Sequence, residues 1–164
     1  MHACFLACQE IFPNTNAIAC ATFEEVFQLA KDNSDYRIII PIENSLAGRV
    51  ADIHYLIPKY KLQIHAEHFQ HVSHNLLGIK GSKLKDIKTV RSHAQAIGQC
   101  NKVISENKLK PIISADTAGS AKFISEKKDK SESAIASELA AKIYNLEILK
   151  SHVEDESGNV TRFL

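Results

Sequence analysis

Hydrophobic and polar positions succeed one another along the chain in a pattern that predicts alternating helices and strands. Residues 3–12 have helical spacing, and residues 23–31 form a second amphipathic stretch. Thr22 is expected to cap this second helix, with Glu25 at the third position of a capping box. Residues 61–79 lack a helical stripe and are expected to form two extended segments.

Short apolar runs predict the strands, and amphipathic stretches between them predict the remaining helices. Strands are expected at 17–21, 38–41, 89–92, 111–115, 134–136, 146–153 and 160–163. Helices are expected at 50–56, 93–106, 117–127 and 138–144, the first of them stopped by Pro58. This alternation is typical of βαβ units, so the sequence predicts an α/β fold with a largely parallel sheet.

The run at 38–49, IIIPIENSLAGR, combines an apolar segment with an abrupt polar end. Its β-branched residues stop at Pro41, and Glu43, Asn44 and Ser45 follow. A buried parallel strand has this pattern when it delivers polar side chains to a pocket at its C-terminal end. The sequence therefore predicts one wall of a ligand site here.

Three other junctions are rich in small polar residues. They read Ser92-His93-Ala94-Gln95, Asp116-Thr117-Ala118-Gly119-Ser120 and Asn159-Val160-Thr161-Arg162. Each by itself is most simply an ordinary helix cap or strand end. Two of them open helices, whose free N–H groups favour an anion. Together the four junctions predict a cleft of neutral donors that suits a small carboxylate ligand.

Composition narrows the class of partner. The chain has 164 residues, 45% hydrophobic and 24% charged, which fits one compact domain or two small lobes. The formal net charge of +1 argues against nucleic acid and anionic membranes as main partners. No secretory signal and no apolar run long enough to span a bilayer is visible, so a cytoplasmic location is expected.

Neither the cysteines nor the histidines predict a metal site. The four cysteines, at 4, 8, 20 and 100, lack the spacing of a zinc set and are expected to be reduced thiols. His65, His68, His71 and His74 recur every third residue, a period that scatters side chains over both faces of an extended segment. Phosphate-loop, dinucleotide and serine-hydrolase signatures are absent, so no cofactor is expected.

Taken in order, the polar junctions resemble the prephenate dehydratase family. The matching segments are PIENSLAGRV at 41–50, ADIHYLIP at 51–58, SHAQAIGQC at 92–100, DTAGSAK at 116–122, SAIAS at 133–137 and NVTRF at 159–163. The resemblance implies a lyase that converts prephenate to phenylpyruvate by coupled decarboxylation and dehydration, in L-phenylalanine biosynthesis. It also implies a two-lobed type II periplasmic-binding-protein-like fold with an inter-lobe cleft. Lobe one would cover about 1–72 plus 155–164, and lobe two about 73–154.

The resemblance also implies roles for individual residues and partners. The family's catalytic threonine falls on Thr161. Its substrate-contacting positions fall on Asn44, Ser45, Ser92, Gln99, Thr117 and Arg162. The implied partners are the small-molecule substrate, prephenate, and a second copy of the chain in a homodimer, with no cofactor and no metal.

Two alternatives to this activity stay open. The first is an arogenate dehydratase, since arogenate differs from prephenate only by an amino group in place of the side-chain keto group. The second is a non-catalytic two-lobed ligand-binding fragment. Compared with the family, the 164 residues are expected to lack the first strand with its Gly-rich turn and the C-terminal ACT domain.

Overall fold

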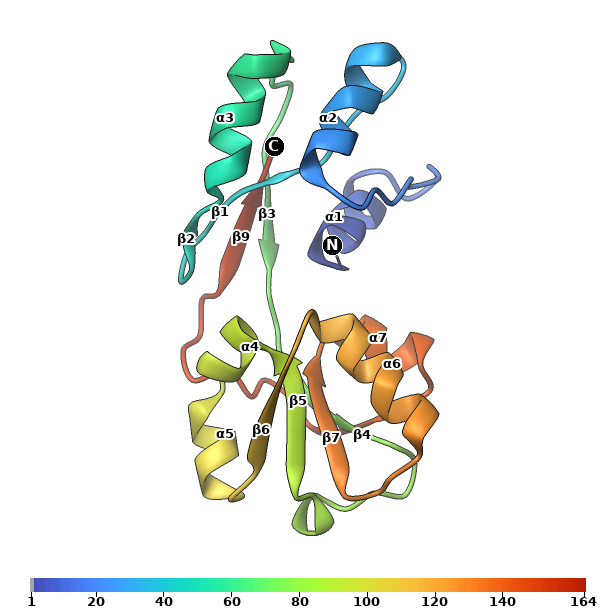
Figure 1. Cartoon of the computed structure of the whole chain (residues 1–164), viewed down its shortest axis with the longest axis vertical. Coiled ribbons are helices and arrows are strands. Elements are labelled where there is room, and N and C mark those ends of the chain that lie inside the picture. The colour runs from blue at the N-terminus through green and yellow to red at the C-terminus, as the bar shows by residue number, and fades with distance from the viewer. Residues whose placement is uncertain (1) are drawn as a thin grey trace. The chain divides into compact units, whose positions relative to one another are not determined.

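The computed structural model describes the backbone of residues 2–164 and the side chains from Cys4 onward. These residues form two compact units, each with helices and its own sheet (Figure 1). Unit 1 runs up to Val72 and takes in Gly158–Leu164, and unit 2 is Ser73–Ser157. The expected α/β class is therefore confirmed.

Unit 1 contains a four-stranded sheet in the order β2-β1-β9-β3. Its elements are α1 (His2–Ile11), α2 (Phe23–Asp32), β1 (Pro41–Asn44), β2 (Gly48–Arg49), α3 (Ala51–Tyr60), β3 (His68–His71) and β9 (Val160–Phe163). Every neighbouring pair is antiparallel. In Figure 1, β9 is the red strand that returns from the end of the chain to lie between β1 and β3. The expectation of a buried parallel strand before Asn44 is therefore wrong.

Two strand expectations in unit 1 fail because their backbone has no ladder partner. Residues 17–21 belong to no strand. Ile38 and Ile39 also lie outside any strand, and no described residue forms a backbone–backbone hydrogen bond with them. Of the three isoleucines at 38–40, only Ile40 pairs with a neighbouring segment, through two backbone hydrogen bonds of 3.1 and 2.9 Å with Leu164. Apolar, β-branched composition favours a strand, but a neighbouring edge is needed to form one.

The helices of unit 1 show the expected capping and one unexpected extension. Thr22 Oγ1 accepts from the Glu25 N–H at 3.2 Å, and the Glu25 carboxylate accepts from the Ala21 N–H at 2.8 Å. The second bond reaches one residue before the cap, but it confirms the capping arrangement. Helix α3 continues through Pro58, where a stop was expected. The loss of one intrahelical hydrogen bond there is offset by burial of Ile53 and its neighbours against α2.

Unit 2 contains a five-stranded sheet in the order β6-β5-β7-β4-β8. Its elements are β4 (Asn75–Gly78), the 3₁₀ turn η1 (Leu84–Asp86), β5 (Thr89–His93), α4 (Ala94–Gly98), α5 (Asn101–Glu106), β6 (Lys110–Ser114), α6 (Thr117–Lys127), β7 (Glu132–Ala136), α7 (Glu138–Ile143) and β8 (Glu147–Lys150). β5 is parallel to both β6 and β7, whereas β4 is antiparallel to β7 and β8. The expected largely parallel sheet is thus found only in half of this unit.

The helix expected over 93–106 is broken in two by a residue far along the chain. Helices α4 and α5 are separated at Gln99 and Cys100. The Asp155 carboxylate accepts from the Asn101 and Lys102 N–H groups, at 2.7 and 2.8 Å, and so caps α5. The Asp155 N–H donates to the Gln99 carbonyl at 2.7 Å. This break fixes the position of Gln99, one of the predicted site residues.

We predict that Gly119→Ala removes the cap of α6. The Gly119 N–H donates to Asp116 Oδ1 at 2.6 Å, and a Cβ on Gly119 would lie 2.7 Å from Asp116 Oδ2. The cap must move aside, so the free energy of unfolding should fall by about 1 kcal/mol in urea denaturation. Gly98→Ala is the matched control, because a Cβ there meets nothing within 4 Å. Equal stability of the two variants would contradict the prediction.

We also predict that Cys100 makes the protein less stable at alkaline pH. Burial of the thiol, assisted by the charges of Asp155 and Glu154, raises its pKa from 9.0 to about 12. Above pH 9 the unfolded chain releases this proton first, so stability is lost as the pH rises towards 12. Between these two pKa values the free energy of unfolding falls by up to about 1.4 kcal/mol per pH unit. Cys100→Ala should show a shallower decline of unfolding free energy above pH 9, and an unchanged slope would contradict this.

Candidate active site

The centre of the candidate site is the hydrogen bond between Asn44 and Thr161. These residues face each other across the antiparallel pair β1 and β9. Asn44 Nδ2 donates to Thr161 Oγ1 at 3.0 Å, and the threonine is only 8% exposed. Since an amide nitrogen can only donate, the hydroxyl oxygen must accept. The hydroxyl proton is left to point elsewhere, and no described residue accepts it.

The oxygen of the Asn44 amide shows which of its two ends faces β9. Asn44 Oδ1 accepts from the Leu46 and Ala47 N–H groups at 3.1 and 2.9 Å. An amide NH₂ could not accept these bonds, so the oxygen must face this turn and Nδ2 must face β9. Asn44 therefore acts both as the anchor of the β1–β2 turn and as a donor to Thr161.

Ser45 joins the end of β1 to the residues that enter β9. Its hydroxyl donates to the Gly158 carbonyl and accepts from the Val160 N–H, both at 2.9 Å. Its backbone N–H donates to the Val160 carbonyl at 2.9 Å. The structure thus brings three predicted site residues, Asn44, Ser45 and Thr161, into one network.

Arg162 lies on the opposite face of β9 from Thr161. Thr161 and Phe163 are buried, whereas Arg162 is half-exposed, as alternation along a strand requires. The guanidinium pairs with Glu43 at 3.1 Å and with Glu67 at 2.7 Å. The hydrogen bonds that the guanidinium donates, to Glu43 above all and to Glu67, raise the pKa of Arg162. Two carboxylates around one guanidinium leave no positive charge to spare for a substrate.

The remaining predicted site residues belong to unit 2. Ser92 lies in β5, one residue before its end, and Thr117 follows the carboxyl end of β6. These two strand ends meet at one edge of the sheet because the strands are parallel. The Ser92 hydroxyl is fully buried and donates to the Ile135 carbonyl at 2.7 Å. Thr117 is the first residue of α6, whose N-terminus is capped by the Asp116 carboxylate through the Gly119 N–H.

Gln99 is held in place by a buried histidine that the sequence did not single out for this role. His74 Nε2 and Gln99 Oε1 are 3.0 Å apart. The amide oxygen can only accept, so Nε2 carries the proton of this bond. The His74 N–H donates to the Glu154 carboxylate at 3.0 Å. Sequence reasoning placed His74 in a regular row of histidines, and only the tertiary structure shows its contact with Gln99.

The residues described contain no group of three or more His, Cys, Asp or Glu side chains that could hold a metal ion. Of the four histidines in the row, His68 lies near Gln70 and Glu10, and His74 contacts Gln99. The other two are exposed. Within the same part of the chain, every helix is too short or too polar to cross a bilayer.

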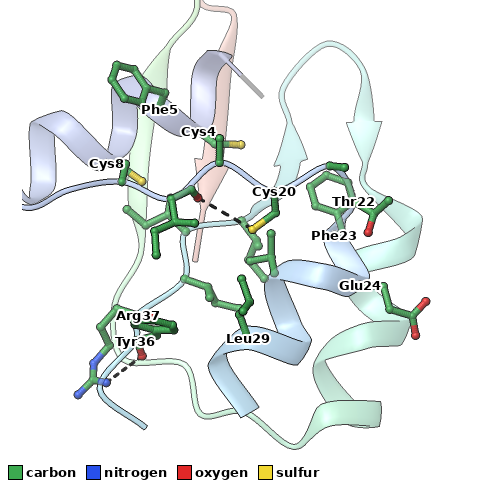
Figure 2. A pocket seen from close by; sticks show the side chains of 18 of the residues that line it. Cys4, Phe5, Cys8, Cys20, Thr22, Phe23, Glu24, Leu29, Tyr36 and Arg37 are labelled. Atoms are coloured by element: carbon green, nitrogen blue, oxygen red, sulfur yellow. Dashed lines mark hydrogen bonds between the residues drawn. The ribbon is translucent and has the colours of Figure 1, made fainter. Parts of the chain in front are cut away.

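A separate apolar pocket of about 900 Å³ lies in unit 1, and none of the predicted site residues lines it. Figure 2 shows Cys4, Phe5 and Cys8 of α1 on one side and Phe23 and Leu29 of α2 on another. Burial raises the pKa of Cys4 and of Cys8. The raised pKa values favour the protonated form of these two thiols.

Comparison with known proteins identifies the family of the chain. The model of the family "Prephenate dehydratase" matches residues 5–164. The bifunctional N-acyl-homoserine lactone acylase/prephenate dehydratase of Komagataeibacter europaeus is 43% identical over 158 residues, which are 96% of this chain and 56% of that protein. Arogenate dehydratase 2 of Petunia hybrida is 37% identical over 96% of this chain and 40% of its own length. The chain thus spans about half the length of the curated relatives it matches.

Solved structures give the same result for the fold. The prephenate dehydratase of Staphylococcus aureus superposes with a TM-score of 0.86 at 26% identity, covering 98% of this chain and 60% of that one. The Arthrobacter aurescens prephenate dehydratase in complex with L-Phe gives 0.87 at 25% identity, over 98% and 55% of the two chains. The expected two-lobed periplasmic-binding-protein-like fold is confirmed. By sequence and by fold, the chain belongs to the prephenate dehydratase family.

Proposed function

We propose that the protein converts prephenate to phenylpyruvate and that Thr161 assists the departure of the ring hydroxyl. The observation that carries this proposal is the bond from Asn44 to Thr161 Oγ1. Because the threonine oxygen accepts from Asn44, its proton is available to a leaving group. The family relationship supplies the reaction, and this bond supplies a donor for it.

The chemistry needs a hydrogen-bond donor more than a strong acid. Prephenate carries a carboxylate and a hydroxyl on opposite carbons of a non-aromatic ring. When the bond to the carboxylate breaks, its electron pair enters the ring, carbon dioxide leaves, and hydroxide departs from the opposite carbon. The ring becomes aromatic, which drives the step, and the hydroxide takes a proton from solvent to become water. A donor at the leaving oxygen stabilises the charge that develops there.

The Asn44 amide strengthens this donor. A hydroxyl that accepts a hydrogen bond becomes a better donor, because successive bonds polarise one another. The low exposure of Thr161 reduces competition from water. A threonine is too weak an acid to release its proton, so Thr161 acts by donating a hydrogen bond to the departing hydroxide.

We assign the other predicted residues either to binding the substrate or to holding the strands of the site. Gln99 and Thr117 supply neutral donors to the substrate's side chain, Thr117 from the first turn of α6. The Ser92 hydroxyl is buried and already donates to the Ile135 carbonyl, so we assign Ser92 to holding β5 against β7. Ser45 contributes through the backbone of β9. Arg162 would have to release Glu43 or Glu67 to bind a carboxylate, so we assign it to holding β1 and β9. The homodimer and the role in phenylalanine biosynthesis rest on the family resemblance, and the cytoplasmic location rests on the sequence pattern alone.

We predict that Thr161→Val lowers kcat on prephenate by roughly 10²- to 10³-fold, since one preorganised donor is lost. Thr161→Ser keeps the hydroxyl and should retain most of the activity. Phenylpyruvate formation is followed by absorbance, and circular dichroism checks that both variants are folded. Near-normal turnover by Thr161→Val would remove Thr161 from the mechanism.

The activity itself is tested with the folded wild-type chain. Turnover of prephenate supports the proposal. Turnover of arogenate alone would make the protein an arogenate dehydratase and overturn the choice of substrate. Binding of prephenate without turnover, measured by calorimetry, would make it a ligand-binding fragment and overturn the enzyme assignment.

A further inference from the structure

Asn159 is a buried polar residue at the centre of the Thr161 network, and no role has yet been given to it. Its side chain is 3% exposed and stands directly before β9. Asn159 Oδ1 lies 2.6 Å from Asn44 Nδ2, the same nitrogen that donates to Thr161. Asn159 therefore shares a donor with the proposed catalytic hydroxyl.

Asn44 Nδ2 carries two hydrogens and has three acceptors within reach. These are Asn159 Oδ1 at 2.6 Å, Thr161 Oγ1 at 3.0 Å and the Val160 carbonyl at 3.3 Å. The two hydrogens lie in the amide plane at a fixed angle, so binding one of them sets the direction of the other. The bond to Asn159 is the shortest of the three. With Asn159 in place, the second hydrogen is directed between Val160 and Thr161.

The backbone around Asn159 is held firmly enough to aim its side chain. The Asn159 carbonyl accepts from the Val72 N–H at 2.8 Å. The residues on either side, Gly158 and Val160, are both bound to the Ser45 hydroxyl at 2.9 Å. Gly158 has a φ of +99°, a conformation that glycine adopts without strain. The backbone on both sides of Asn159 is thus held in place.

We propose that Asn159 is a positioning residue, which orients the Asn44 amide so that Thr161 Oγ1 accepts a hydrogen bond and donates its own. The proposal rests on the proposed function for its kinetic consequence. Asn159 does not touch the reacting atoms. Its effect is transmitted through Asn44 to the threonine hydroxyl, so it acts on kcat and leaves KM for prephenate nearly unchanged.

The first test is a double-mutant cycle. Asn159→Ala should lower kcat roughly tenfold, the effect of misdirecting about one hydrogen bond. In the Thr161→Val background, where no hydroxyl remains to be oriented, the same change should cost less than about twofold. Asn107→Ala is the matched control, because it removes an asparagine side chain that donates to the Val103 carbonyl at 2.8 Å in unit 2. It should leave kcat unchanged.

Additive effects of Asn159→Ala and Thr161→Val would overturn the proposal, because they would show a role that does not pass through the threonine. So would an increase in KM with unchanged kcat. Thermal unfolding of both asparagine variants separates loss of fold from loss of orientation. If Asn159→Ala fails to fold, Asn159→Ser provides a smaller change on which the same cycle is run.

A second test does not depend on activity. The Asn44 side-chain NH₂ signals in an ¹⁵N-correlated NMR spectrum report its two bonds directly. Asn159→Ala should shift both signals and the Thr161 signals as well, whereas Asn107→Ala should shift neither. Unchanged Asn44 and Thr161 signals would overturn the positioning role even in an active enzyme. Shifted signals in a chain without prephenate turnover would overturn the proposed function and leave the positioning role standing.

Discussion

The insertion of β9 between β1 and β3 is the interaction on which the rest of unit 1 depends. Without it, β1 would keep only the two-residue partner β2, and β3 would have no partner. β9 also brings Thr161 opposite Asn44. The same ladder that closes the sheet therefore builds the candidate site. A substitution that shifts this register by one residue would turn Thr161 to the face now held by Arg162.

The two faces of β9 separate neutral from charged chemistry. On the Thr161 face, the network consists of amides, hydroxyls and backbone groups, all of them uncharged. On the other face, Arg162 is bound by Glu43 and Glu67. A reaction that releases carbon dioxide from a carboxylate gains from an uncharged site, because a nearby cation would stabilise the reactant anion more than the neutral product. The charges of Arg162, Glu43 and Glu67 thus lie on the side away from Thr161.

Local patterns predicted the elements whose partners are local. The capping of α2 and the helix at 117–127 were confirmed. The strand at 160–163 was confirmed as well, although its partners β1 and β3 are distant in sequence. Other elements that depend on distant partners were not predicted. Ile38 and Ile39 have strand composition without a neighbouring edge, and the helix expected at 93–106 is split by Asp155. The direction of β1 relative to its neighbours was mispredicted for the same reason. Its antiparallel pairing is imposed by a strand 116 residues further along the chain.

For the site, the sequence indicated the right segments but not the roles within them. Asn44, Ser45 and Thr161 were singled out as polar groups after apolar runs, and the structure places them in one network. Nothing local showed that Arg162 points away from them or that His74 binds Gln99. Those facts follow from strand alternation in the folded sheet and from contacts between elements that are distant in sequence.

The return of β9 also sets an order of events during synthesis. Unit 2 is continuous in sequence, so its strands and helices leave the ribosome one after another, with no part of unit 1 between them. Unit 1 is discontinuous, and its central strand emerges only after the whole of unit 2. A nascent chain can therefore complete unit 2 while β1 and β3 still expose unpaired edges, which are sites of intermolecular association. Those edges are paired when β9 arrives, so the strand that closes the sheet is also the one that delivers Thr161.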